Sequence, residues 1–215
     1  MSWKIKDLER ALLVGSTLVE GSTLSEREAI QVLAGKTIQG HPIQEIRELL
    51  NFRSAVEWLI QQFEKAPFLS IDLLLEFHKR LFLGFPGEHG QFKSQQNYTY
   101  LLDGSRQDYS HPALVKGEIS TWVEHFNSAT KTPDPALTAA ELYFEFQRIH
   151  PFEDGNGRIG RVLVAYWLHW KAKSSFTFML KDKTDHLKAL AEASKGNLNL
   201  LKTFFKKRIK KERRL

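Results

Sequence analysis

The sequence predicts an all-α fold with one short β-hairpin added. Apolar residues recur at helical spacing over most of the 215 residues, and capping pairs such as Ser25 with Glu28 separate the periodic segments. A polar and aromatic composition typical of strands is confined to the segment 91–102. Since no internal repeat or low-complexity linker interrupts the chain, we expect a single domain over 1–215.

The first four predicted helices precede residue 84. A stripe of leucines predicts a helix over 3–18, and the capping box of Ser25 and Glu28 begins a second helix that ends near Gly35. Two further periodic segments predict helices at about 43–64 and 68–83.

The chain then changes character. The segment 91–102 is followed by the turn signal Asp103-Gly104, which predicts a β-hairpin. Asp134 followed by Pro135 is typical of a helix N-terminus. Helices are predicted at 112–126, 135–149, 158–170, about 184–194 and about 197–208.

The composition excludes several kinds of chemistry. The chain contains no cysteine, so disulfides, thiolate nucleophiles and Cys-based zinc sites are excluded. The net charge of +6 resides in the tail 206–215, because the other 205 residues hold 24 basic and 24 acidic side chains. We therefore do not expect nucleic acid as a partner, although a tail contact with it remains open. We find no signal peptide or membrane span and expect a cytoplasmic protein.

The most informative segment is 150–161, His-Pro-Phe-Glu-Asp-Gly-Asn-Gly-Arg-Ile-Gly-Arg. One helix is predicted to end before it and another to begin within it, and its glycines let the backbone approach a ligand closely. The amides of Gly155, Asn156 and Gly157 lie at that helix start. They favour an anion, because N–H groups and the helix dipole both attract negative charge.

Four side chains of the segment extend this site. Arg158 and Arg161 are three residues apart on one helix face, so they can grip successive phosphates. Asp154 is an oxygen ligand suited to Mg²⁺, and His150 can accept a proton near neutral pH. Together these groups predict phosphoryl or nucleotidyl transfer. A merely structural His150 is the alternative.

The segment is similar to the Fic motif, His-x-Phe-x-Asp/Glu-Gly-Asn-Gly-Arg-x-x-Arg, and matches it at every specified position. The resemblance covers most of the chain, from about Ser16 to about Phe205. It includes Gly90-Gln91-Phe92-Lys93, which introduces the hairpin that family members use as a flap. Lys93 is a departure, because many relatives have arginine there.

The resemblance implies a Fic-type helical bundle that acts as a protein adenylyltransferase. His150 would deprotonate a Ser, Thr or Tyr hydroxyl of a target protein, which attacks the α-phosphorus of ATP and expels pyrophosphate. Asp154 would hold Mg²⁺. Within the loop and helix at 150–170, the residues that would bind the nucleotide phosphates are Gly155, Asn156, Gly157, Arg158 and Arg161.

The hairpin would bind the target. As a flap it would clamp the target backbone by adding a strand, using Asn97, Tyr98, Thr99 and Tyr100. ATP and an unidentified target protein are thus the expected partners. A homodimer remains open, since dimers are common among such relatives.

A second pattern lies upstream, in Ser16-Thr17-Leu18-Val19-Glu20-Gly21. It resembles the family's inhibitory motif Ser/Thr-x-x-x-Glu-Gly/Asn, within an autoinhibitory helix over about 4–21. The resemblance implies that Glu20 pairs with Arg161, the arginine meant for the γ-phosphate, so that ATP binds unproductively. An ordinary exposed helix end is the alternative.

Two other functions remain open. One is a related transferase of the same fold, which removes AMP or moves another phosphate-containing group. The intact Asn156-Gly157-Arg158 favours AMP transfer over the kinase-like branch. The other is a non-catalytic module that binds nucleotide or DNA.

Overall fold

The computed structural model describes residues 8–101, 103–129 and 132–211. It confirms the predicted fold class, because helices dominate the described chain and each of its strands is three residues long. Two compact units are present: an N-terminal unit of Met1–Gln91 with Phe178–Leu180, and a C-terminal unit of Phe92–Thr177 with Lys181–Leu215. The single domain over 1–215 stays a prediction. Residues 4–7 of the predicted inhibitory helix lie outside the described residues.

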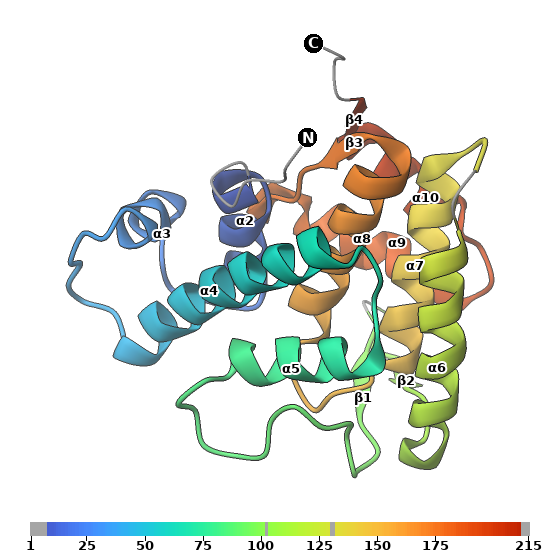
Figure 1. Ribbon diagram of the computed structural model, residues 1–215, viewed down its shortest axis with the longest axis horizontal. Coiled ribbons are helices and arrows are strands. Elements are labelled where there is room, and N and C mark those ends of the chain that lie inside the picture. The colour runs from blue at the N-terminus through green and yellow to red at the C-terminus, as the bar shows by residue number, and fades with distance from the viewer. Residues whose placement is uncertain (1–7, 102, 130–131, 212–215) are drawn as a thin grey trace. The chain divides into compact units, whose positions relative to one another are not determined.

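The N-terminal unit is organised by the long helix α4 (Ile43–Lys65), which packs against α3 (Glu26–Leu33) and α5 (Ile71–Leu81) (Figure 1). Its helices begin where the capping residues predict: the Ser25 side chain accepts the amide of Glu28, and the reciprocal bond of the capping box is also formed. The buried residues of α4 lie on one side and form the centre of this unit.

The first described turns differ from the predicted continuous α-helix. Residues Glu9–Leu13 form a π-helical turn (η1), which continues into α2 (Val14–Val19). The segment 178–180 docks here, because the amide of Phe178 donates to the carbonyl of Ala11 at 2.7 Å. A Cβ on Gly15 would lie 2.0 Å from the carbonyl oxygen of Phe178, so only glycine permits this approach.

The C-terminal unit is a group of packed helices. Helix α7 (Pro135–Ile149) contacts α6 (Pro112–Ser128), α8 (Asn156–Ala172) and α10 (Asn199–Arg208), and α10 also packs against α9 (Lys183–Ser194). Figure 1 shows α6 and α7 side by side. Every residue of α8 from Arg158 to Leu168 is buried, so this helix lies at the centre of the C-terminal unit.

Gly160 explains how closely α8 approaches α7. A Cβ at this position would lie 2.5 Å from Gln147 Nε2, 3.1 Å from Phe146 Cδ1 and 3.2 Å from Tyr143 Cε2. The two helices that carry the predicted site are therefore in direct contact at the first turn of α8, and their relative position depends on the missing side chain.

The predicted hairpin is present. Strand β1 (Tyr98–Tyr100) pairs antiparallel with β2 (Arg106–Asp108), with Thr99 opposite Gln107. A second pair of strands, β3 (Ser174–Phe176) and β4 (Ile209–Lys211), was not predicted. Its strands are too short to show periodicity in the sequence.

The first residues of the basic tail 206–215 belong to α10 and to β4. Arg208 at the end of α10 forms an ion pair with Asp182 at 2.6 Å, in the short helix η2 (Leu180–Asp182). The Arg208 guanidinium also lies 3.7 Å from the centre of the Phe204 ring. Residues 212–215 lie outside the described residues.

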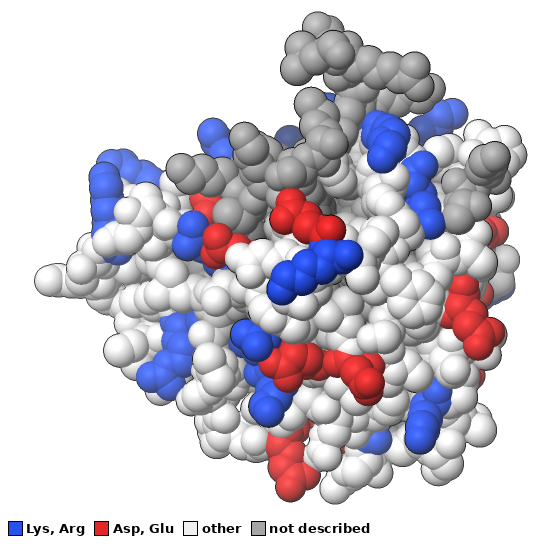
Figure 2. Space-filling view, viewed as in Figure 1, with Lys and Arg blue, Asp and Glu red and all other residues white. Residues whose placement is uncertain are grey.

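No helix among the described residues combines the length and apolarity that a membrane crossing requires. On the face shown in Figure 2, basic and acidic side chains are interspersed. That distribution agrees with the balance of charge outside the tail. The cytoplasmic location stays a prediction.

Candidate active site

His150 lies where α7 ends, in a left-handed backbone conformation with φ 49°. This conformation is uncommon for a residue other than glycine and requires support from its surroundings. Its Nδ1 lies 3.3 Å from the carbonyl oxygen of Gln147. Since a carbonyl only accepts, Nδ1 donates in this contact, and in the neutral ring Nε2 then carries the lone pair. The ring stacks on Tyr109, with ring centres 3.7 Å apart and planes 7° apart.

The loop after His150 is braced by Asn156, whose side chain is 1% exposed. Asn156 Oδ1 accepts the amide of Phe152 at 3.0 Å, and its Nδ2 donates to the Phe152 carbonyl at 2.8 Å. Phe152 is fully buried, as expected for a residue that anchors the loop. The Asn156 side chain thus acts within the loop, and only its main-chain amide belongs to the predicted anion site.

Helix α8 begins at Asn156, after Gly155 in the left-handed region with φ 82°. The first amides of any α-helix have no acceptor within the helix, so those of Asn156, Gly157 and Arg158 form the start of an anion-binding site. Asp154 lies at the same place: Gly155 donates its amide to Asp154 Oδ1, and Arg158 Nη2 lies 3.3 Å from Asp154 Oδ2. The structure brings these five predicted residues together.

Arg161 lies one turn further along α8 and is 3% exposed. Burial, together with the positive charges of Arg161 and Arg208, lowers the pKa of the neighbouring His186 to about 3. His186 is therefore neutral at physiological pH, and its Nε2 lies 2.9 Å from the Tyr143 hydroxyl. His186 is thus a core histidine, as we expected for the histidines outside the motif.

The start of the flap is fastened to the loop that carries His150. Asn97 Nδ2 donates to the carbonyl of Phe152 at 3.2 Å, and the amide of Ser94 donates to Glu153 Oε1 at 3.2 Å. Lys93 is 4% exposed and donates to Asn97 Oδ1 at 2.6 Å. The remaining flap residues Tyr98 and Tyr100 are exposed, and Thr99 is half-buried between them.

A pocket of about 120 Å³ lies among the flap, α7 and α9. Tyr109 and Gln147, which hold the His150 ring, belong to its lining, so the pocket adjoins the candidate base. Much of the remaining wall is apolar, as is usual for small-molecule sites. The other lining residues are Thr99, Tyr100, Leu101, Gln107, Phe144, Arg148, Leu187, Leu190 and Ala191.

The three residues of the predicted inhibitory motif lie in the N-terminal unit. Ser16 is buried in α2, Glu20 ends this helix with an exposed side chain, and Gly21 adopts φ 101°, a conformation that favours glycine. The residues predicted to bind nucleotide lie in the C-terminal unit. The pairing of Glu20 with Arg161 therefore stays a proposal.

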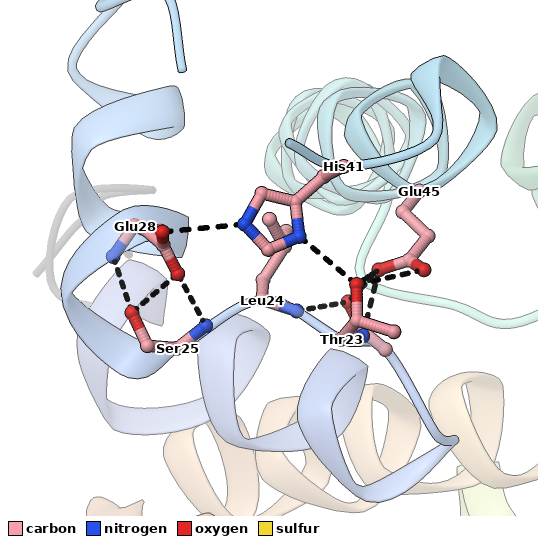
Figure 3. Close-up of polar contacts among 7 residues, drawn as sticks. Thr23, Leu24, Ser25, Glu28, His41 and Glu45 are labelled. Atoms are coloured by element: carbon pink, nitrogen blue, oxygen red, sulfur yellow. Dashed lines mark hydrogen bonds and ion pairs between the residues drawn. The ribbon is translucent and has the colours of Figure 1, made fainter. Parts of the chain in front are cut away.

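The chain directly after Gly21 is held by a polar network (Figure 3). Thr23 Oγ1 lies 2.9 Å from His41 Nδ1, and His41 Nε2 lies 3.2 Å from Glu28 Oε1. Glu45 accepts the amide of Thr23 at 2.7 Å and the Ser22 hydroxyl at 2.8 Å. Hydrogen bonds from Ser25 and the contact with His41 lower the pKa of Glu28 to about 2. This network ties the exit of α2 to α3 and α4.

Sequence reasoning missed several residues that build the site. Tyr109 and Gln147 hold the ring of His150, yet neither belongs to the motif, and no local pattern distinguishes them. Gly160 stands within the motif at an unspecified position, and its spacing from Gly157 gave a signal that could have been used. Lys93 was noted only as a departure from arginine.

Comparisons with known proteins agree with this geometry. Residues 68–168 match the family model described as Fic/DOC family. The protein adenylyltransferase fic-1 of Caenorhabditis elegans is 28% identical over 185 residues, which are 84% of this chain and 35% of that protein. The protein adenylyltransferase Fic of Nematostella vectensis is 26% identical over 207 residues, 92% of this chain and 46% of that protein. The chain thus spans less than half the length of these curated relatives.

Solved structures show the same fold. Fic-1 (residues 134–508) from C. elegans superposes with a TM-score of 0.78 at 26% identity, covering 96% of this chain and 63% of that one. A Fic-domain-containing signalling protein from Bacteroides thetaiotaomicron superposes with a TM-score of 0.80 at 24% identity, covering 94% and 81% of the two chains. A more distant neighbour, BepC from Bartonella tribocorum with bound AMPPNP, has a TM-score of 0.58 at 17% identity and covers 79% and 89%.

Proposed function

We propose that this chain, which matches the Fic/DOC family model over residues 68–168, is a protein adenylyltransferase that transfers AMP from ATP to a hydroxyl of a target protein. One observation carries the proposal: His150 ends α7, and only the loop 151–155 separates it from α8, whose first six residues include Gly157, Arg158 and Arg161. A proton acceptor beside an anion site suits the activation of a hydroxyl for attack on a phosphate. The names of the curated relatives support the same activity.

In the proposed reaction, the target hydroxyl gives its proton to His150 Nε2 while its oxygen attacks the α-phosphorus of ATP. The new oxygen–phosphorus bond replaces the bond from the α-phosphorus to the oxygen that bridges to the β-phosphate, and pyrophosphate leaves. The Gln147 carbonyl and the Tyr109 ring keep the imidazole oriented for this proton transfer. A general base of this kind contributes about 10²–10⁴-fold to the rate.

The nucleotide phosphates would lie at the start of α8. The amides of Asn156, Gly157 and Arg158 are the first of this helix and would donate to phosphate oxygens, and the Arg158 and Arg161 side chains come from the same helix. These amides and guanidinium groups would stabilise the negative charge that spreads over several phosphate oxygens in the transition state.

Asp154 fits the predicted role of Mg²⁺ ligand. Its side chain is 70% exposed, so it can reach a cation on the solvent side of the loop. Mg²⁺ is commonly bound by one or two carboxylates, with phosphate oxygens and water as its other ligands. When bound there, Mg²⁺ would neutralise charge on the phosphates of ATP.

The pocket beneath the flap would hold the adenine ring. It adjoins His150, and its mixed lining of Leu187, Leu190 and Tyr109 suits a flat aromatic ring. The flap itself would hold the target: β1 and β2 form a two-stranded sheet, so each strand has an edge at which an extended peptide can pair. The exposed rings of Tyr98 and Tyr100 lie on β1.

We further propose that Glu20 restrains the enzyme. Its carboxylate would pair with the Arg161 guanidinium that otherwise binds the γ-phosphate, so that ATP binds with its α-phosphorus misaligned. Two features support this: Glu20 ends α2 with an exposed side chain, and the network of Thr23, His41 and Glu45 holds the chain that follows.

The proposed activity is tested with labelled ATP in a cell extract. A Glu20→Gln protein, which keeps the shape of the side chain but loses its charge, should label itself or a target more strongly than wild type. Adding Arg161→Ala should erase the gain, because the partner of the removed charge is then absent. Equal labelling by wild type and Glu20→Gln, with a competent target present, would refute the restraint.

The role of His150 is tested in the Glu20→Gln background. His150→Ala should reduce AMP transfer by about 10²–10⁴-fold, while ATP affinity measured by calorimetry changes little, because the helix N-terminus is intact. Unchanged transfer by the His150→Ala variant would refute the mechanism.

A further inference from the structure

We propose that Lys93 is a positioning residue that holds the turn bearing His150 and fastens the flap to it. Lys93 contacts no nucleotide phosphate in the proposed reaction, and nothing in the motif includes it. The inference depends on the proposed function only in giving His150 the role of base. The contacts themselves lie entirely within the C-terminal unit.

Lys93 binds the backbone on both sides of His150. Its Nζ donates to the carbonyl of Ile149 at 3.2 Å, and its main-chain amide donates to the carbonyl of Pro151 at 2.8 Å. His150 between them has the left-handed φ of 49°, which costs energy unless the surroundings impose it. A single residue from a distant part of the chain thus supplies two of the bonds that impose this conformation.

Lys93 Nζ also binds the flap. Nζ donates to Asn97 Oδ1 at 2.6 Å, and the Asn97 carbonyl accepts the amide of Tyr109 at 3.2 Å. Tyr109 in turn stacks on the His150 ring. The contacts therefore form a closed circuit from Lys93 through Asn97 and Tyr109 to His150 and back through Ile149.

The groups around Lys93 Nζ suit an amine donor. The acceptors around Nζ are uncharged oxygens, the Tyr109 ring centre lies 5.8 Å away, and Glu153 and Glu118 are the acidic groups that act on it. Burial lowers the pKa of Lys93 to about 8. A neutral amine still donates two hydrogen bonds, enough for Asn97 Oδ1 and the Ile149 carbonyl.

The test compares Lys93→Met in the full chain with Lys116→Met, a control at an exposed lysine of α6. Hydrogen exchange reports the fastening of the flap, and ¹⁵N NMR of the imidazole reports the tautomer of His150. In Lys93→Met, we expect exchange over 94–110 to be about ten-fold faster or more, because the Nζ donor is lost and its two acceptors, Asn97 Oδ1 and the Ile149 carbonyl, no longer receive its hydrogen bonds. The His150 ring nitrogens should shift toward a mixture of tautomers. Lys93→Arg, which retains donors, should restore both signals toward wild type.

A second variant separates the two hydrogen bonds that Lys93 Nζ donates. Asn97→Ala removes the Nζ acceptor in the flap and the bond from Asn97 Nδ2 to the Phe152 carbonyl, but leaves the bond from Nζ to the Ile149 carbonyl. Exchange over the flap should therefore rise while the His150 tautomer signal stays close to wild type. If Lys93→Met does not fold, Asn97→Ala still tests the proposed role of Lys93.

Two results would overturn the proposal: wild-type exchange and wild-type imidazole shifts in Lys93→Met, or wild-type flap exchange in Asn97→Ala. Neither measurement depends on AMP transfer. If the chain transfers no AMP but both signals change as expected, the proposed function fails and the positioning role of Lys93 stands.

Discussion

Replacement of Asn156 by alanine tests whether this side chain braces the loop or binds phosphate. Both ends of the buried amide bond the main chain of Phe152, at 3.0 and 2.8 Å. Asn156→Ala would remove the acceptor of the Phe152 amide, a buried group. The Phe152 carbonyl would keep its bond from Asn97 Nδ2. The variant therefore leaves the buried Phe152 amide without an acceptor. It also loses the hydrogen bond from Asn156 Nδ2 to the Phe152 carbonyl.

The expected loss of stability follows from these two terms. A buried donor without an acceptor costs about 1–3 kcal/mol, and an ordinary hydrogen bond contributes about 0.5–1.5 kcal/mol. We therefore expect the free energy of unfolding to fall by about 2–4 kcal/mol and the melting temperature by roughly 5–15 °C. Asn156→Asp should also destabilise the protein, since a carboxylate oxygen would replace the donor that lies 2.8 Å from the Phe152 carbonyl.

Thermal unfolding with and without ATP distinguishes the two roles. Asn199→Ala is the matched control, because Asn199 is also the first residue of a helix but is exposed, and it should melt within about a degree of wild type. If Asn156→Ala melts like wild type and loses only the stabilisation by ATP, the side chain binds phosphate and the reasoning from its internal bonds is refuted.

Two further predictions concern stability. Gly160→Ala should lower the free energy of unfolding by about 1–3 kcal/mol, measured by denaturant titration, because the new Cβ would meet Gln147 and Phe146 of α7; a Gly117→Ala control on α6 meets nothing within 4 Å and should not be destabilised. Acid should loosen the exit of α2: the pKa of Glu28 is lowered to about 2, so its stabilising effect is complete above its ordinary value of 4.5 and is lost as pH falls toward 2. Hydrogen exchange over 25–33 should show this loss, and Glu28→Gln should reduce its dependence on pH.

Local chemistry made much of this protein predictable from its sequence. The capping box of Ser25 and Glu28 and the start of α7 at Pro135 lie where they were predicted. The hairpin β1–β2 also lies in the predicted segment. Such features depend on residues within about four positions of one another, so the bonds that create them are present whichever way the rest of the chain folds.

The candidate site was predictable in its residues but not in its supports. The order of His150, Asp154 and the arginines follows from one contiguous segment, which determines the turn and the helix N-terminus that they share. The brace formed by Asn156 could not be distinguished from a phosphate contact, because both roles require the same residue at the start of a helix. In the structure the Asn156 side chain is buried, and this burial assigns it to bracing the loop.

The remaining features depend on residues that are distant in the sequence. Lys93 meets the carbonyls around His150, and Tyr109 stacks on its ring. Strand β3 at 174–176 finds its partner at 209–211. Local propensity does not predict these contacts between distant segments. They form only when the packing of the helices brings the segments together and offsets the entropy of closing the loops between them.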